Sequence, residues 1–170
     1  MLLVRDTGRE LLIGRIVEVE AYLDNDPASH SYRGTTQRNS VMFAEGGRLY
    51  VYFTYGMHFC ANVVTEKEGK GCAVLLRGVE PLEGISLMAR RRGMNRSRIG
   101  DLCNGPAKLC QAFAIGRREN GTDLCDGRIW ISRPGALPRL RRIIRTPRIG
   151  ITKGTKRLWR FVLAEPPYRT

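Results

Sequence analysis

Long apolar runs and metal-type cysteine pairs are both missing from this sequence of 170 residues. No apolar run approaches the roughly 18 residues that a membrane helix needs, and the apolar start of MLLVRDTGRE is too short for a signal peptide. The five cysteines are odd in number and form no CxxC pair, which argues against a disulfide framework or a zinc ribbon. We therefore expect no membrane span, no metal site, and buried reduced thiols in an intracellular protein. The cysteines are Cys60, Cys72, Cys103, Cys110 and Cys125.

Acidic residues are scarce, with 16 Asp and Glu against 29 Lys and Arg, which gives a net charge of +13. The positive charge is clustered: Arg90–Arg98 contains five arginines, and Arg133–Arg160 contains ten basic residues and no acidic one. Solvated surfaces usually mix both signs, so a one-signed cluster of this size favours a polyanionic partner. Because no basic amphipathic helix of clear period is present, nucleic acid is favoured over an anionic membrane.

The pattern of apolar residues indicates the fold class. The length favours one domain, residues 1–170, with a self-sufficient core. Apolar stripes from Leu82 and from Pro106 predict two short helices, and Gly116 is expected to end the second. We predict an α+β fold, a single compact domain with a mainly antiparallel, curved β-sheet and packed helices. Strands are expected at residues 15–22, 49–53, 58–64, 72–79 (ended by Glu80-Pro81), 128–132 and 158–163.

Aromatic side chains gather in one short segment, RLYVYFTYGMHFC, at residues 48–60. Tyr55-Gly56 separates two β-prone runs and predicts a hairpin tip. In a strand, Tyr50 and Tyr52 share one face of the sheet. Packing on a sheet is a sufficient reason for most of these rings, but a hairpin tip is usually exposed, so Tyr55 is different. An exposed aromatic ring in a basic protein is a candidate for stacking on bases or inserting between them.

Several polar side chains are candidates for chemistry, although each also has a purely structural explanation. Glu20 and Tyr22 share one face of a predicted strand, as in many charged surface strands, yet a carboxylate beside an aromatic ring can also act as a general base. His30 lies in a turn-rich segment, where a histidine is more often simply solvated. Arg77 interrupts an apolar run, and a structural ion pair is its default explanation, with Glu20 as a possible partner.

Five blocks of sequence resemble a known family. They are GRIVEVEAYL, HSYRGTTQRNSVMF, LYVYFTYGMHFCANVV, LLRGVEPLEG and LCNGPAKLCQAFAI. In this order and spacing they resemble the alkyladenine DNA glycosylases, also called 3-methyladenine DNA glycosylases. The resemblance covers about residues 14–116, and the short motifs RIGI and WRF extend it to about residue 161. Five consecutive blocks are far more specific than one short motif.

The resemblance implies a monofunctional DNA glycosylase that starts base excision repair. Such an enzyme flips an alkylated or deaminated purine out of duplex DNA and hydrolyses the N-glycosidic bond with an activated water. It uses no metal and no cofactor. Glu20 corresponds to the general base for this water, and Arg77 to the arginine that helps to hold it. Tyr55 corresponds to the residue that is inserted into the gap left in the base stack.

Six more residues are implied to bind the flipped base. Three of them provide the rings that sandwich it, and the last two contribute backbone. His30 would also offer a hydrogen bond to the edge of the base, and Asn62 would disfavour the 2-amino group of normal guanine. The six residues are Tyr22, His30, Tyr52, Asn62, Ile149 and Gly150.

The implied partner is double-stranded DNA that contains damaged purines. We expect a monomer that acts in association with DNA inside the cell, with an N-terminal segment shorter than is usual in this family. The alternative is a non-catalytic nucleic-acid-binding module that uses the same basic and aromatic surface. Base release from alkylated DNA discriminates between the two. The presence of Glu20 favours the enzyme, because a carboxylate that faces DNA hinders simple binding.

Overall fold

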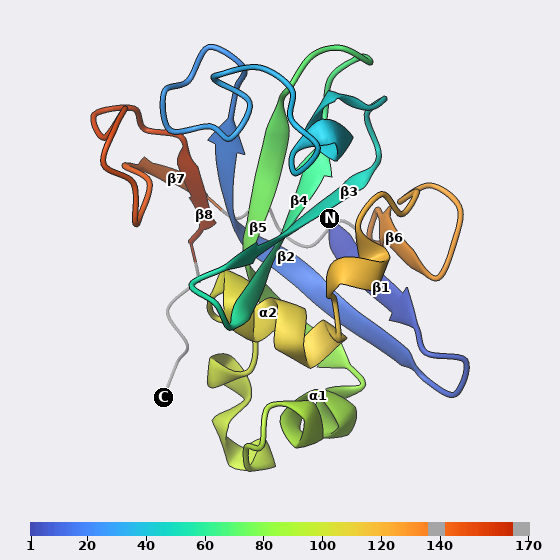
Figure 1. Ribbon diagram of the computed structural model, residues 1–170. Helices are drawn as coiled ribbons and strands as arrows, with labels where there is room; N and C mark the ends of the chain where they lie inside the picture. Colours follow the sequence, from blue (N-terminus) through green and yellow to red (C-terminus); the bar gives the residue numbers. More distant parts are fainter. Residues whose placement is uncertain (136–141, 165–170) are drawn as a thin grey trace.

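The computed structural model describes residues 1–135 and 142–164. These residues form one antiparallel sheet of eight strands, two α-helices and three short 3-10 helices (Figure 1). The predicted α+β class with a mainly antiparallel sheet is therefore confirmed. The strands are β1 (Leu2–Asp6), β2 (Leu11–Tyr22), β3 (Leu49–Thr54), β4 (His58–Val64), β5 (Ala73–Glu83), β6 (Ile129–Ser132), β7 (Ile143–Thr146) and β8 (Arg160–Leu163). The helices are η1 (Ser40–Phe43), α1 (Ile85–Arg91), η2 (Arg96–Asp101), α2 (Pro106–Phe113) and η3 (Arg117–Glu119).

Strand β2 forms the centre of the sheet. It pairs with β5 along one edge, while along the other edge it pairs first with β1 and then with β8. The register with β5 shifts on both sides of Glu18, and such bulges bend a strand. The stretch from Glu18 to Glu20 pairs with β5 on one side and with β8 on the other, so it lies in the interior of the sheet. Glu20 has no solvent-exposed surface there.

The main core lies between the sheet and the two α-helices. Helix α2 packs against β4 and β5, and α1 packs against α2 (Figure 1). Pro106 occupies the first turn of α2, as predicted. Gly14 allows the helix to come close, because a Cβ at this position would lie 2.8 Å from Val79 Cγ2 and 3.1 Å from the Phe113 ring. In the described part of the chain, no helix has the length and apolarity to cross a membrane.

Strand β5 is longer than predicted. It continues through Glu80-Pro81, which was expected to end it, and stops at Glu83. Strand β4 pairs with β5 only as far as Leu75, so the described residues place no strand beside the later part of that edge. Pro81 can therefore lack a backbone donor without breaking a ladder. Leu82 belongs to this strand, not to the first helix.

Two other expectations also need correction, and one strand was not predicted. Helix α2 ends at Phe113, and its C-cap is Ala114, which adopts the left-handed conformation with φ of 51°, and not Gly116. Cys125 is exposed, whereas the other four cysteines are buried as expected. Strand β7 was not predicted, because its residues IIRT lie within the basic stretch Arg133–Arg160. Residues 136–141 of that stretch lie outside the described residues.

The hairpin of β3 and β4 matches its prediction. The two strands are antiparallel with Thr54 opposite His58, so Tyr55-Gly56 lies at the tip. Tyr55 has a φ of 50° and Gly56 a φ of 67°, and consecutive positive values match the twist of a tight hairpin. The Tyr55 side chain is 84% exposed. Tyr50 and Tyr52 share one face of the hairpin, with ring centroids 5.7 Å apart.

Candidate active site

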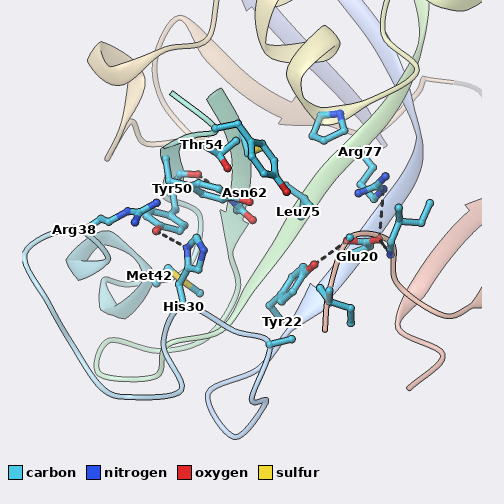
Figure 2. Close-up of a pocket in the computed structure, with 18 residues that line it drawn as sticks. Glu20, Tyr22, His30, Arg38, Met42, Tyr50, Thr54, Asn62, Leu75 and Arg77 are labelled. Atoms are coloured by element: carbon cyan, nitrogen blue, oxygen red, sulfur yellow. Dashed lines mark hydrogen bonds and ion pairs between the residues drawn. The ribbon is translucent and has the colours of Figure 1, made fainter. Parts of the chain in front are cut away.

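A pocket of about 330 Å³ lies beside the β3–β4 hairpin (Figure 2). All nine residues for which the sequence predicted a role line this pocket, although they come from four strands, a hairpin tip and two loops. Its volume falls at the lower end of the range for sites that bind small organic groups. The nine residues are Glu20, Tyr22, His30, Tyr52, Tyr55, Asn62, Arg77, Ile149 and Gly150.

Glu20 lies at one end of the pocket and is held from two sides. Its Oε2 accepts a hydrogen bond of 2.9 Å from the Tyr22 hydroxyl, and its Oε1 accepts one of 2.8 Å from the Ile149 backbone N–H (Figure 2). The strand period places Tyr22 on the same face of β2 as Glu20. Burial is the main cause that raises the pKa of Tyr22, and the neighbouring Glu20 raises it further, so the phenol keeps its proton and donates.

Arg77 faces two carboxylates. Its Nε donates to Glu18 Oε1 at 2.8 Å and lies 3.4 Å from Glu20 Oε1, so the predicted partner Glu20 is the more distant of the two. Glu18 also accepts a hydrogen bond of 2.6 Å from Arg160 Nε. Burial acts to raise the pKa of Glu18, but the hydrogen bonds from Arg160 and Arg77 outweigh it and lower the pKa. Glu18 therefore stays charged and holds Arg77 beside Glu20.

His30 forms one wall of the pocket. Its Nδ1 lies 3.0 Å from the Tyr50 hydroxyl, and its ring centroid lies 4.5 Å from that of Tyr52 (Figure 2). Part of His30 reaches the protein surface, yet the groups around its ring remove enough water to lower its pKa, with a smaller contribution from Arg38. Burial raises the pKa of Tyr50 to about 12. A protonated Tyr50 can donate to Nδ1, which puts the proton of the neutral imidazole on Nε2.

Asn62 and Tyr52 face the pocket from neighbouring strands of the hairpin. Asn62 is 5% exposed, and its Nδ2 donates to the Tyr50 carbonyl at 3.1 Å, which fixes the orientation of the amide. Burial is the main cause that raises the pKa of Tyr52, so this ring is also neutral. The polar groups of this wall are therefore held in place by the sheet.

Tyr55, Ile149 and Gly150 stand at the exposed border of the pocket. Ile149 is 50% exposed, and it contributes to the site through its backbone N–H, which donates a hydrogen bond to Glu20. Gly150 has a φ of 74°, which favours glycine. The loop between β7 and β8 thus reaches the pocket although it lies about 130 residues from β2 in the sequence.

Three further residues had no predicted role: Tyr50 lines the pocket, whereas Asp26 and Arg148 contact groups of the site without lining it. Tyr50 had a visible signal, since it shares a strand face with Tyr52. Arg148 and Asp26 form an ion pair with no exposed side-chain surface, in which Nη2 lies 3.0 Å from Oδ1. No pattern in the sequence indicates this pair, because Arg148 is one of ten basic residues in its stretch. Arg148 faces inward and is not a phosphate contact.

The described residues contain no group of three or more His, Cys, Asp or Glu side chains placed to bind a metal ion. The expectation of a reaction without metal or cofactor therefore still rests on the resemblance.

The comparison with known families agrees with this geometry. The model of the methylpurine-DNA glycosylase family matches residues 1–167. The chain belongs to this family. The family resemblance seen in the sequence and the predicted enzyme class, a DNA glycosylase with a function in DNA repair, are confirmed.

Proteins from three organisms are close relatives over most of the chain. A protein of Carboxydothermus hydrogenoformans is 49% identical over 98% of this chain and 86% of its own length. One of Methanoculleus marisnigri is 51% identical over 91% of this chain and 81% of its own length. One of Rubrobacter xylanophilus is 46% identical over 98% and 88%, respectively. Each is named "Putative 3-methyladenine DNA glycosylase".

Proposed function

We propose that this protein is a monofunctional DNA glycosylase that flips an alkylated or deaminated purine out of duplex DNA and hydrolyses its N-glycosidic bond with a water activated by Glu20. The observation that carries the proposal is the buried Glu20 carboxylate beside Arg77, at one end of a pocket with aromatic walls. Simple binding of DNA does not require this carboxylate, and its charge opposes phosphate. The alternative of a non-catalytic binding module therefore leaves Glu20 unexplained.

The hydrolysis needs a proton acceptor and a good leaving group. The water oxygen bonds to the sugar C1′ while the C1′–N9 bond breaks and its electron pair leaves with the purine. Glu20 takes the proton of the water, and Arg77 helps to hold that water. Each oxygen of Glu20 accepts one hydrogen bond, from the Tyr22 hydroxyl and the Ile149 N–H, respectively. A carboxylate has about four acceptor sites, so capacity for a water remains. Alkylation or protonation makes the purine a good leaving group.

The pocket walls supply the energy that flipping costs. Removing a base from the stack costs a few kcal/mol, and aromatic contacts on the flipped base offset this cost. Tyr22, His30 and Tyr52 provide the rings, and the Nε2 proton of His30 is available for the edge of the base. Asn62 stands against the 2-amino group of normal guanine. Tyr55, 84% exposed at the hairpin tip, enters the gap in the duplex.

The proposed partner is double-stranded DNA with damaged purines, bound by one copy of the protein in the cell. Residues 1–170 act as a single glycosylase domain in this proposal. The net charge of +13 supports attraction to the phosphate backbone.

Base release from defined duplexes tests the function. Duplexes with a single hypoxanthine, 1,N6-ethenoadenine or 7-methylguanine are mixed with excess protein, and the rate of base release is measured. Glu20→Gln should lower this rate by on the order of 10²- to 10⁴-fold and leave duplex affinity equal or higher, because the amide cannot accept the proton and no longer repels phosphate. Glu83→Gln removes an exposed carboxylate at the end of β5, outside the pocket, and should keep the wild-type rate.

A Glu20→Gln protein with a rate within a few-fold of wild type would remove Glu20 from its role. A wild-type protein that binds these duplexes but releases no base would support the binding module instead.

A further inference from the structure

The buried Asp26–Arg148 ion pair touches the strand that carries the catalytic carboxylate. Arg148 Nη2 lies 3.0 Å from Asp26 Oδ1, and Nη1 contacts Oδ2. Nη1 also donates to the Ala21 carbonyl at 2.8 Å. Ala21 is the residue between Glu20 and Tyr22, so the guanidinium binds the backbone of β2 at the level of the pocket.

This ion pair is a poor source of stability. Both side chains are fully buried, and the cost of removing two charges from water often exceeds their attraction. Arg148 Nε is buried and has no hydrogen-bond partner among the described residues, which adds a further cost. A role other than stability is therefore needed to explain why these two charges are placed here.

The contacts of Arg148 lead directly to two groups of the pocket. The next residue, Ile149, donates its backbone N–H to Glu20 Oε1 at 2.8 Å. The Arg148 guanidinium carbon also lies 4.5 Å from the centroid of the Tyr22 ring, within the range of a cation–π contact. Arg148 itself does not line the pocket. Its side chain thus fixes the position of groups that do.

The loop that follows leaves no space around the pair. Gly154 has a φ of 63°, and a Cβ there would lie 3.0 Å from Asp26 Oδ1 and 3.1 Å from Arg148 Nη2. Arg157 Nη1 lies 3.7 Å from Asp26 Oδ1 and places a second cation beside this carboxylate. The pair is therefore enclosed by the same loop that forms one border of the pocket.

We propose that Arg148, held by Asp26, is a positioning residue for base release. It sets the Ile149 N–H against the Glu20 carboxylate and supports the Tyr22 ring. The inference rests on the proposed function, in which Glu20 activates the water. A small displacement of a reacting group is enough to slow a reaction strongly, so the effect should fall on the chemical step more than on DNA binding.

Conservative variants of both partners test this role. Arg148→Lys keeps the charge but cannot reach two acceptors in a fork, and Asp26→Asn keeps the shape but not the charge. Each should slow release of hypoxanthine at saturating protein by about 10- to 100-fold. Affinity for the same duplex at fixed salt should stay within about threefold of wild type, because Arg148 is not a phosphate contact.

The matched control is Arg5→Lys. Arg5 donates to the Ala114 carbonyl at 2.8 Å and to the Glu119 carboxylate at 3.0 Å. Like Arg148 it thus binds one backbone carbonyl and one carboxylate, but it lies outside the pocket. This variant should keep the wild-type rate per folded molecule, with the folded fraction taken from a thermal melt. Rates of the Arg148 and Asp26 variants that match this control would overturn the inference.

A double variant separates positioning from general damage to the fold. If Arg148 acts through Glu20, most of the loss caused by Arg148→Lys should disappear in a Glu20→Gln protein. A double variant whose loss in rate equals the product of the two single losses would show a structural role and overturn the inference. A wild-type rate for Glu20→Gln alone would instead remove the proposed function, so the two failures are distinguishable.

Discussion

At the scale of single residues, the two histidines of the chain stand in contrasting surroundings. His30 borders the pocket, where burial and Arg38 lower its pKa. Both histidines have exposed surface, but His58, on β4, does not line the pocket. A histidine whose pKa is lower in the folded state takes up a proton more readily when the protein unfolds. The stability that neutral His30 contributes is therefore complete above its unfolded pKa, near 6.5, and is lost as the pH falls through the lower folded value.

We predict that His30→Gln reduces the loss of stability on acidification. Urea unfolding of wild type should show a lower midpoint at pH 5.5 than at pH 7.5, and the difference should be smaller in His30→Gln, since the titrating group is gone. His58→Gln provides the control and should show the wild-type difference. An equal loss in both variants would contradict the assignment of this pH dependence to His30.

At the scale of elements, the β3–β4 hairpin has a packed base and an exposed tip. Tyr52 packs against His30 and against a small buried cluster, whereas Tyr55 extends beyond the strands. The cluster consists of Met42, Tyr50, Val64 and Ala73. The two strands of this hairpin pair along the whole length of β3, from Leu49 opposite Val63 to Thr54 opposite His58. Stability and DNA distortion should therefore depend on different tyrosines of one hairpin.

We predict that Tyr55→Ala leaves the melting temperature nearly unchanged but destabilises the flipped state by roughly the few kcal/mol that unstacking costs. Fluorescence of 2-aminopurine next to a lesion reports flipping, and a melt of the same protein reports stability. Tyr52→Ala should lower the free energy of unfolding by about 3 kcal/mol, because it removes a packed ring. A Tyr55→Ala protein that flips normally and melts much earlier would assign this tyrosine to the core.

At the scale of the whole molecule, part of the positive charge lies in a hollow next to the pocket. This second hollow, of about 400 Å³, adjoins the first and shares His30 and Gly150 with it. Its lining includes the cations Arg33 and Lys153 and no acidic residue. In the proposed function, we expect the DNA strand next to the flipped nucleotide to follow this hollow, with its phosphates near both cations.

We predict that Arg33→Gln and Lys153→Gln each weaken binding to undamaged duplex and flatten the log–log salt dependence by about 0.9. The measurement is a titration at several salt concentrations. Arg9→Gln is the control, since Arg9 precedes β2 and lines neither hollow. A slope that changes equally in all three variants would show that the cations act only through net charge.

Much of the site was predictable from short stretches of sequence. Glu20 and Tyr22 lie two residues apart on one strand, and Tyr52 and Tyr55 lie on one hairpin, so their relation follows from local geometry. The boundaries of β5 and α2 were less predictable. Pro81 is tolerated because of the pairing around it, and Ala114 adopts a left-handed conformation that its sequence does not indicate.

The sequence by itself determined the fold class, the hairpin and nine of the residues that line the pocket, because these depend on period, turn chemistry and family blocks. Only the tertiary structure decided which groups hold Glu20 and Arg77. Ile149 meets Glu20 through its backbone N–H, and Arg148 meets Asp26 across 122 residues. Such contacts arise where β8 pairs with the bulged part of β2, and neither hydropathy nor charge clustering encodes the partner of a buried charge.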